Sequence, residues 1–385
     1  MPVDLFSLYV HIPFCIRKCS YCDFYSIPYT KELSDKLLWA IQKEFELRVI
    51  ENHLEKAEVD TVFYGGGTPS ILSLDQWEKH LREMNRSIQR TENCEWTAEC
   101  NPDSFSSLKA DMWIAYGVNR LTLGMQSLDE GLLKKLGRPH TAQRTAEVLA
   151  DSSLEKFKSV GIDLMYALPE QDSALFRETL KEALSIPFVK HLSVYELDIH
   201  PDTEFGRNRS RLNLPDETVC IAMDDLLLKE TKHAGFHRYE ISNFARQGFE
   251  CRHNKCYWEH KPYIGLGPAA HSFVNSTRWA NVADVDEYIS LVEDGKLPTA
   301  SQEILSQKDI ANEMLFLRLR TSEGLNEISF EEKTGILFYD GVRKPMIASF
   351  LDKGCIVFEN PWWRLTEKGM RIADAIARKL MTSDA

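Results

Sequence analysis

Three cysteines near the start of the sequence constrain this chain more than any other feature. Cys15, Cys19 and Cys22 form a Cys-x3-Cys-x2-Cys triplet within the segment YVHIPFCIRKCSYCDFYS. Three thiolates at this spacing can hold three irons of a [4Fe-4S] cube, which normally takes four cysteines. The fourth iron is then open and, as a Lewis acid, can chelate a small ligand. The triplet therefore predicts an iron–sulfur cluster with one coordination site free.

A Cys3His zinc site is the alternative interpretation of the same residues. His11 stands four residues before Cys15, and structural zinc prefers four closed ligands. This alternative predicts a zinc-stabilised binding module without redox chemistry. Four further cysteines lack ligand spacing and are expected to be small core residues: Cys94, Cys100, Cys220 and Cys355.

Composition narrows the function classes. The chain has 385 residues, of which 43% are hydrophobic, enough for a large core and a smaller second domain. Neither a secretory signal nor an apolar run long enough to span a bilayer is present, which predicts a cytoplasmic protein whose clustered thiols bind metal. A formal net charge of -12 argues against a general nucleic-acid binder.

Apolar runs alternate with amphipathic stretches over residues 1–200, which predicts a series of βα units. Six such units imply a parallel sheet, and because a closed barrel needs eight, we expect an open, partial barrel. The predicted strands cover residues 5–11, 59–64, 95–100, 119–123, 162–165 and 191–197. The predicted helices cover residues 31–52, 74–88, a stretch near 108, 132–154 and 175–184.

Glycines and polar side chains follow the predicted strands, at the edge where such folds bind ligands. In the segment YGGGTPS, residues without a Cβ let the backbone approach a ligand closely; an ordinary tight turn is the alternative. Glu99 can accept hydrogen bonds from an ammonium or a ribose, Gln126 and Asp163 can hold hydroxyls, and Arg138 can pair with a carboxylate. Together these groups suit a zwitterionic nucleoside.

The segment HNKCYW offers chemistry suited to heme. An imidazole from His253, or a thiolate from Cys251 or Cys256, is a standard axial ligand of heme iron. Tyr257 and Trp258 supply flat apolar surface for a porphyrin. The alternative is a hydrogen-bonded histidine beside a core tryptophan.

The chain changes character towards its end. Residues 201–298 are expected to extend the barrel and to carry the HNKCYW segment, and residues 299–385 to form a winged-helix-like α+β domain. The predicted elements of that domain are helices at 309–320, 326–333, 342–353 and 367–380, with a hairpin through 355–358 and 363–365. The third of these helices, 342–353, carries only three cations. We therefore expect the domain to act as a lid or a docking surface rather than to bind DNA.

Ten segments carry a family resemblance over nearly the whole chain: YVHIPFCIRKCSYCDFYS, FYGGGTPS, AECNPDS, RLTLGMQSLD, LGRPHT, GIDLMYALP, LSVYELDIHPDTEF, YEISNFA, HNKCYW and YIGLGPAAHSF. They resemble the oxygen-independent coproporphyrinogen dehydrogenase superfamily of radical S-adenosylmethionine (SAM) proteins, and within it the group of heme chaperones. The dehydrogenases carry a further cysteine where this chain has Phe24, and a longer N-terminal extension before the first strand. HNKCYW matches the chaperone group.

The resemblance implies a fold, cofactors and site residues. The fold is α/β, a partial (β/α)6 radical SAM barrel with a C-terminal winged-helix-like domain, and the cofactors are a [4Fe-4S] cluster on the triplet and SAM. Gln126, Arg138 and Asp163 match positions that contact a second SAM in the dehydrogenases. The other implied SAM-contacting residues are Tyr9, Gly66, Gly67, Thr68 and Glu99, and the implied heme-binding residues are His253, Asn254, Tyr257 and Trp258.

The expected function is that of a cytoplasmic radical SAM-type heme chaperone, which binds heme and transfers it to an acceptor hemoprotein. The resemblance implies an acceptor of a respiratory chain, with membrane contact only through that acceptor, and no nucleic-acid partner. No catalytic residue is assigned. An oxygen-independent coproporphyrinogen III dehydrogenase is the alternative enzyme, which the replacement of a cysteine by Phe24 disfavours.

Overall fold

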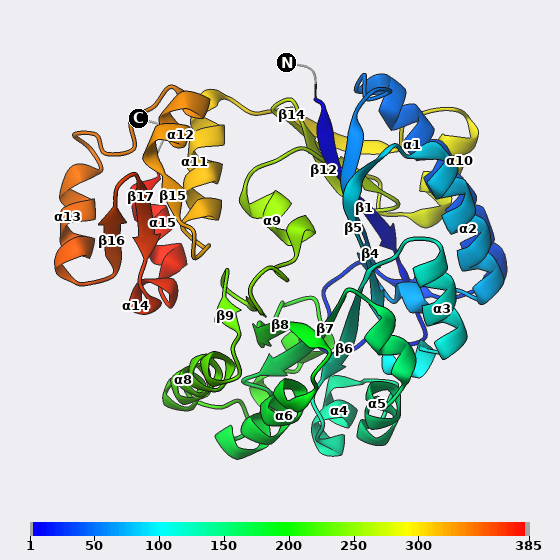
Figure 1. The fold of residues 1–385 in the computed structure, drawn as a ribbon, viewed down its shortest axis with the longest axis horizontal. Coiled ribbons are helices and arrows are strands. Elements are labelled where there is room, and N and C mark those ends of the chain that lie inside the picture. Colours follow the sequence, from blue (N-terminus) through cyan, green and yellow to red (C-terminus); the bar gives the residue numbers. More distant parts are fainter. Residues whose placement is uncertain (1–2, 382–385) are drawn as a thin grey trace.

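A curved sheet of twelve strands organises the protein in the computed structural model, which describes residues 3–381. Its six central strands are parallel and follow one another in chain order, and helices cover their convex side (Figure 1). The strands are β1 (Leu5–Ile12), β4 (Glu58–Gly66), β5 (Arg90–Cys100), β6 (Arg120–Gln126), β7 (Ser159–Tyr166) and β8 (Val189–Glu196). The expected partial barrel of six βα units is therefore present.

The outer helices begin at polar caps. Thr30 caps α1 and accepts a hydrogen bond from the Leu33 amide, and Ser73 and Gln76 form a capping box at α2, which satisfies backbone donors that the first helical turn leaves free. The helices are α1 (Lys31–Glu51), α2 (Leu74–Ser87), α3 (Ser107–Ala115), α4 (Glu130–Leu136), α5 (Ala142–Leu149) and α6 (Ser173–Ser185).

The prediction of a single helix over residues 132–154 is wrong in its extent. The structure has α4 and α5 there, followed by a short 3-10 helix at Ser152–Lys156. Gly137 adopts a left-handed conformation with φ of 72° and ends α4, as glycine does at many helix C-termini. Pro139 follows two residues later, and Thr141 caps the new helix. Apolar periodicity continues across this break and hides it from pattern analysis.

Strands from later in the chain extend both edges of the sheet. Beside β1 lie β11 (Tyr263–Leu266), which is parallel to it, and then the antiparallel strands β12 (His271–Val274), β13 (Thr277–Asn281) and β14 (Thr299–Ile304). Beside β8 lie β10 (Asn243–Ala245) and β9 (His237–Arg238). The sheet thus continues to Ile304, six residues beyond the expected domain boundary at 298, because β14 pairs with β13 along its length.

Helix α9 (Arg252–Trp258), which carries HNKCYW, lies on the concave side of the sheet (Figure 1). The other helices of this region are α7 (Glu204–Arg207), α8 (Glu217–His233) and α10 (Val285–Glu293). Residues 201–304 therefore close part of the open barrel with a helix that faces its interior.

A small module with its own hydrophobic cluster ends the chain. It has a three-stranded sheet in the order β15-β17-β16, and the expected final helix is split in two. Its elements are α11 (Gln307–Arg318), β15 (Leu325–Asn326), α12 (Glu327–Thr334), α13 (Lys344–Asp352), β16 (Ile356–Glu359), β17 (Trp362–Leu365), α14 (Glu367–Met370) and α15 (Ala373–Leu380). Arg343, just before α13, is fully buried and donates to the Leu380 carbonyl at 2.9 Å, so it offers no surface cation to DNA.

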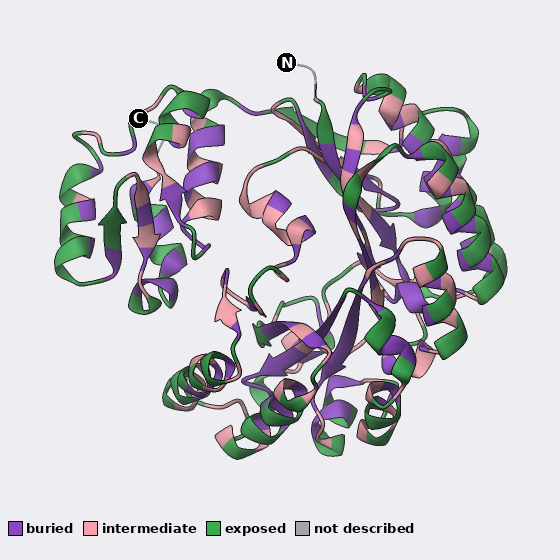
Figure 2. Ribbon diagram, viewed as in Figure 1, coloured by how far each residue is buried: buried purple, intermediate pink, exposed green. Residues whose placement is uncertain are grey.

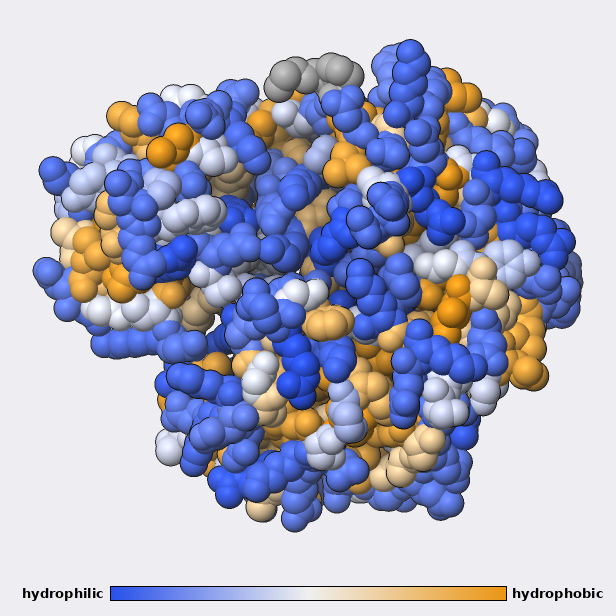
Figure 3. Space-filling view, viewed as in Figure 1, coloured by the Kyte–Doolittle hydropathy of each residue, from blue (hydrophilic) through white to orange (hydrophobic). Residues whose placement is uncertain are grey.

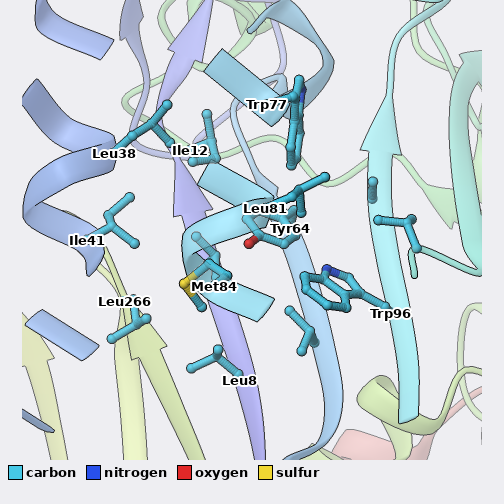
Figure 4. Packing of buried hydrophobic residues seen from close by; sticks show 14 of the residues in the cluster. Leu8, Ile12, Leu38, Ile41, Tyr64, Trp77, Leu81, Met84, Trp96 and Leu266 are labelled. Carbon is cyan, nitrogen blue, oxygen red and sulfur yellow. The ribbon is translucent and has the colours of Figure 1, made fainter. Parts of the chain in front are cut away.

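Strand alternation sends apolar and polar side chains to opposite faces of the sheet. In β1, Leu8 and Ile12 pack under the helices with Tyr64, Trp77 and Trp96 (Figure 4). Figure 2 shows the strands buried and the outer helix faces exposed. The intervening positions of the strands point to the concave side, where they form the interior of the barrel.

The outer surface shows mainly hydrophilic side chains, with apolar ones gathered over α13 and β16 and also around α3 and the helices below it in the view (Figure 3). Within residues 3–381, none of the helices combines the length and the apolar character needed to cross a membrane.

Candidate functional site

The cysteine triplet lies on the loop that leaves β1. The short parallel strands β2 (Phe14–Cys15) and β3 (Ile27–Pro28) pair and close this loop. Cys15, Cys19 and Cys22 are free thiols at its half-buried positions. Burial raises the pKa of Cys15, and it raises the pKa of Cys22 to about 11. Binding metal at these thiols would therefore release protons.

Two side chains from outside this loop contact the triplet: Thr68, just after β4, and Arg138, just after α4. The Thr68 hydroxyl lies 3.6 Å from the Cys15 sulfur, and Arg138 Nη1 donates to the Cys19 sulfur at 3.5 Å. A cation and a hydroxyl beside the sulfurs would stabilise thiolates rather than thiols. The loop is therefore suited chemically to a cluster of net negative charge.

The zinc alternative fits this geometry poorly. His11 uses both ring nitrogens: Nδ1 hydrogen-bonds the Tyr9 hydroxyl at 3.0 Å and Nε2 the Tyr25 carbonyl at 3.2 Å. Nowhere in residues 3–381 do three His, Cys, Asp or Glu side chains converge as they would on one metal ion. A cube binds each thiolate through a different iron, so it does not require that convergence.

A cavity of about 320 Å³ opens directly onto the triplet. Buried polar atoms without a hydrogen-bond partner face this region, namely Gln126 Oε1, Arg138 Nε and Asp163 Oδ1. Such orphaned groups fit a polar ligand, since leaving them unpaired costs free energy. The cavity brings together the following sequence-predicted residues: Cys15, Cys19, Cys22, Gly66, Gly67, Thr68, Glu99, Gln126, Arg138 and Asp163.

Gly66 and Gly67, at the end of β4, must be glycine for different reasons. Gly66 has a φ of 107°, and a Cβ there would lie 2.5 Å from the His11 ring. A Cβ on Gly67 would instead lie 2.7 Å from the Phe14 carbonyl oxygen. Gly66 thus allows a backbone conformation that other residues avoid, and Gly67 allows the cysteine loop to pack against β4. Both glycines line the cavity at the triplet, and the expectation that they contact SAM stays a prediction.

Two carboxyls lie inside the barrel, Glu99 on β5 and Asp163 on β7, with β6 between the two strands. Burial, with the charge of Asp163 as a second cause, raises the pKa of Glu99 to about 8. Burial also raises the pKa of Asp163 to about 6. Glu99 is therefore mostly protonated at neutral pH until a cation arrives. An ammonium group placed beside it would lower its pKa and gain an ion pair.

A second cavity, of about 530 Å³, lies next to the first on the concave side of the sheet. The two share part of their lining, including Phe24, Gly66, Glu99 and Asp163. The strands form one wall of the second cavity and α9 contributes to another. Its aromatic lining consists of Tyr9, Phe24, Tyr25, Phe63, Tyr195, Tyr257 and Tyr263.

The structure separates the residues of HNKCYW. Asn254 and Tyr257 line the second cavity, whereas Trp258 lines a different one near the C-terminal module. His253 is 1% exposed and its ring stacks on Phe63 with centroids 5.0 Å apart. Its Nδ1 hydrogen-bonds Thr61 at 2.7 Å and its Nε2 Tyr257 at 2.8 Å, so neither nitrogen is free for iron.

The alternative thiol ligands are also buried. Cys251 lines the second cavity, with its sulfur 3.5 Å from Glu95 Oε1, and Cys256 contacts backbone carbonyls. Burial raises the pKa of both thiols, to about 12 and about 11. Neither is poised as a thiolate, and α9 instead fastens to β4 and β5 through the side chains of His253 and Cys251.

Sequence reasoning missed further residues of the second cavity. Arg120, Thr122, His191, Ser193 and His271 all line it. The first four occupy inward positions of β6 and β8, and the signal for them was the alternation of polar residues along strands that are otherwise apolar. His271 stands in the segment YIGLGPAAHSF, and its place beside the barrel depends on the β1–β11–β12 pairing.

Comparisons with known proteins agree with this architecture. The family model "Radical SAM superfamily" matches residues 9–183, and "HemN C-terminal domain" matches residues 305–372. The heme chaperone HemW of Bacillus subtilis is 33% identical over 96% of this chain and 97% of its own length, and that of Escherichia coli is 31% identical over 94% of each chain. Among solved structures, coproporphyrinogen III oxidase (HemN) of E. coli, a radical SAM enzyme, has a TM-score of 0.86 at 22% identity, covering 99% of this chain and 91% of its own.

Proposed function

The chain belongs to the HemW heme chaperone family within the radical SAM proteins, and we propose that it binds heme and transfers it to a hemoprotein. One observation carries the proposal. The aromatic-lined cavity of about 530 Å³ shares a wall with the cavity at the cysteine triplet. Flat aromatic side chains around a space of this size suit a porphyrin.

In this proposal Cys15, Cys19 and Cys22 hold a [4Fe-4S] cluster, and SAM lies in the cavity beside it. When bound, the cluster supplies an electron that can cleave the sulfonium of SAM. Glu99 accepts a hydrogen bond from the ammonium or ribose of SAM. Arg138 is close enough to the triplet to pair with the carboxylate of SAM. The backbone at Gly66 approaches the methionyl part.

The aromatic cavity holds the heme on the concave side of the sheet. Tyr257 and Asn254 of α9 line it from one wall, and Phe24, which is 62% exposed, borders both this cavity and the one at the triplet. This cavity is open to solvent at exposed residues such as His271. A cargo that must be passed on needs such access, because a fully caged heme would leave too slowly.

Phe24 also bears on the alternative activity. In the dehydrogenases that this chain resembles, the corresponding residue is a cysteine, and here a phenyl ring borders both cavities. A phenyl ring neither donates a proton nor carries an electron equivalent as a thiol does. We therefore propose a binding and transfer function in place of oxidative decarboxylation of coproporphyrinogen.

An experiment on one anaerobically reconstituted sample tests the proposed function. Heme titration should give a saturable Soret band at about one heme per chain, and mixing with an apo-hemoprotein such as apomyoglobin should transfer it. Coproporphyrinogen III with SAM and a reductant should give no protoporphyrinogen. Turnover of coproporphyrinogen, or failure of the parent protein to bind heme, would refute the proposal.

A further inference from the structure

An unusual cation lies in the interior of the barrel. Arg120 is 2% exposed and shares a row of the sheet with Tyr9, Phe63 and Thr97. Since neighbouring residues of one row point to the same face, its side chain points to the concave side. It lines the aromatic cavity of about 530 Å³. A buried guanidinium in such a position calls for an anionic partner.

The protein supplies only part of that partnership. Arg120 Nη1 donates to the Phe249 carbonyl at 3.0 Å and to the Ser159 hydroxyl at 3.3 Å, and it forms an ion pair with Glu95 Oε2 at 3.7 Å. Its Nε and Nη2 have no hydrogen-bond partner within the described structure. Two free N–H donors on a planar fork match the geometry of a carboxylate.

The groups around Arg120 do not oppose an incoming carboxylate strongly. Asp163 and Glu99 line the same cavity, but burial raises the pKa of Asp163 to about 6 and that of Glu99 to about 8. His191 has an unpartnered Nδ1 and bonds Tyr239 through Nε2 at 2.8 Å. The Glu95 carboxylate is the main opposing charge, and it is engaged by the His253 amide at 3.0 Å.

The same cavity contains one histidine whose ring is accessible. His271, the first residue of β12, is exposed and lines the cavity. Across the described residues its imidazole makes no hydrogen bond, ion pair or ring contact with another side chain, whereas His11 and His253 each have both ring nitrogens engaged. His191 is buried against Tyr239. An imidazole with a free nitrogen at a cavity wall is what heme iron requires as an axial ligand.

We propose that heme lies in this cavity with its iron bound to His271 and one propionate bound to Arg120. The proposal rests on the heme-binding function proposed above. Heme combines a flat apolar ring with two carboxylates, and the cavity combines aromatic walls with one buried, partly unpaired guanidinium. An iron ligand at the exposed rim also leaves the metal accessible to an acceptor. His253 of the HNKCYW segment then holds α9 in place and does not bind iron.

The iron ligand is tested by spectroscopy on His271→Ala, with His233→Ala as the control at another exposed histidine, on α8. At saturating heme, His271→Ala should lose the Soret position and the electron paramagnetic resonance signature of histidine-bound ferric heme, and added imidazole should restore them. His233→Ala should match the parent. A parent-like spectrum in His271→Ala would overturn the assignment of the ligand.

The propionate contact is tested by comparing heme with its dimethyl ester in the parent and in Arg120→Gln. The parent should bind heme about 10- to 100-fold more tightly than the ester, as expected for one charge-assisted contact. Arg120→Gln should bind the two ligands equally. Affinity for the ester reports whether the variant still folds around the ring. An unchanged preference for free heme in Arg120→Gln would overturn the contact.

Different results would refute the proposed heme-binding function and the assignment of His271 and Arg120. If the parent protein binds no heme, the proposed function fails. If the parent binds heme, but the spectrum of His271→Ala and the ester preference of Arg120→Gln both match the parent, heme binds elsewhere and only this inference fails.

Discussion

Replacing His253 by alanine is the change that best separates a structural role from iron binding. The ring of His253 bridges Thr61 on β4 and Tyr257 on α9, with hydrogen bonds of 2.7 and 2.8 Å. Burial lowers its pKa to about 3, so the ring is neutral, and one nitrogen donates while the other accepts. Truncation removes both bonds and the stacking on Phe63.

The expected loss in the free energy of unfolding follows from these contacts. A buried hydroxyl left without its partner costs about 1–3 kcal/mol, and loss of the ring stack costs about 0.5–1.5 kcal/mol. Tyr257 borders the aromatic cavity, where water can reach its hydroxyl. Because water then replaces part of the lost hydrogen bond, the summed loss of stability falls towards the lower end of these ranges. We expect His253→Ala to reduce the free energy of unfolding by about 3 kcal/mol.

Urea unfolding of the apo protein, followed by circular dichroism, measures this loss. Asn254→Ala is the control, because Asn254 is the next residue on α9 and only half-buried; it should cost less than about 1 kcal/mol. At saturating heme, His253→Ala should keep the parent Soret position. A variant that keeps its stability and loses that Soret position would refute the reasoning and identify His253 as the iron ligand.

Three further outcomes are expected. Cys19→Ser should lose the visible absorption of the reconstituted cluster while Cys220→Ser keeps it; full iron content in the first variant would contradict the cluster assignment. Gly66→Ala should reduce the free energy of unfolding by about 2–4 kcal/mol and weaken SAM binding in calorimetry, because its Cβ meets an imidazole ring at 2.5 Å. The control Gly295→Ala, with φ of 70° and open space around the Cβ, should reduce it by only about 1 kcal/mol. Burial raises the pKa of Glu99 from 4.5 to about 8. The folded state therefore holds a proton that the unfolded state releases, so stability should fall as pH rises from about 4.5 to 8, and Glu99→Gln should flatten this fall in unfolding titrations.

The sequence by itself determined the sheet and the location of the ligand-binding edge. Alternating apolar runs and amphipathic stretches predicted the six parallel strands, because each strand must bury one face under a helix and each crossover needs a helix's length. The Cys15–Cys22 loop and the glycines after β4 were visible for the same reason: their meaning lies in local spacing and in backbone freedom. The assignment of individual residues to the cluster and SAM stays a prediction.

Only the tertiary structure decided what the interior of the barrel offers. His253 looks like a metal ligand in its segment, and it is held by Thr61, which lies 192 positions away in the chain. Arg120 looks like an ordinary strand residue, and it becomes a buried cation with free donors because the curved sheet turns its row inward. Whether a polar group is paired or free depends on partners that folding brings from distant strands, and local sequence patterns carry no record of those partners.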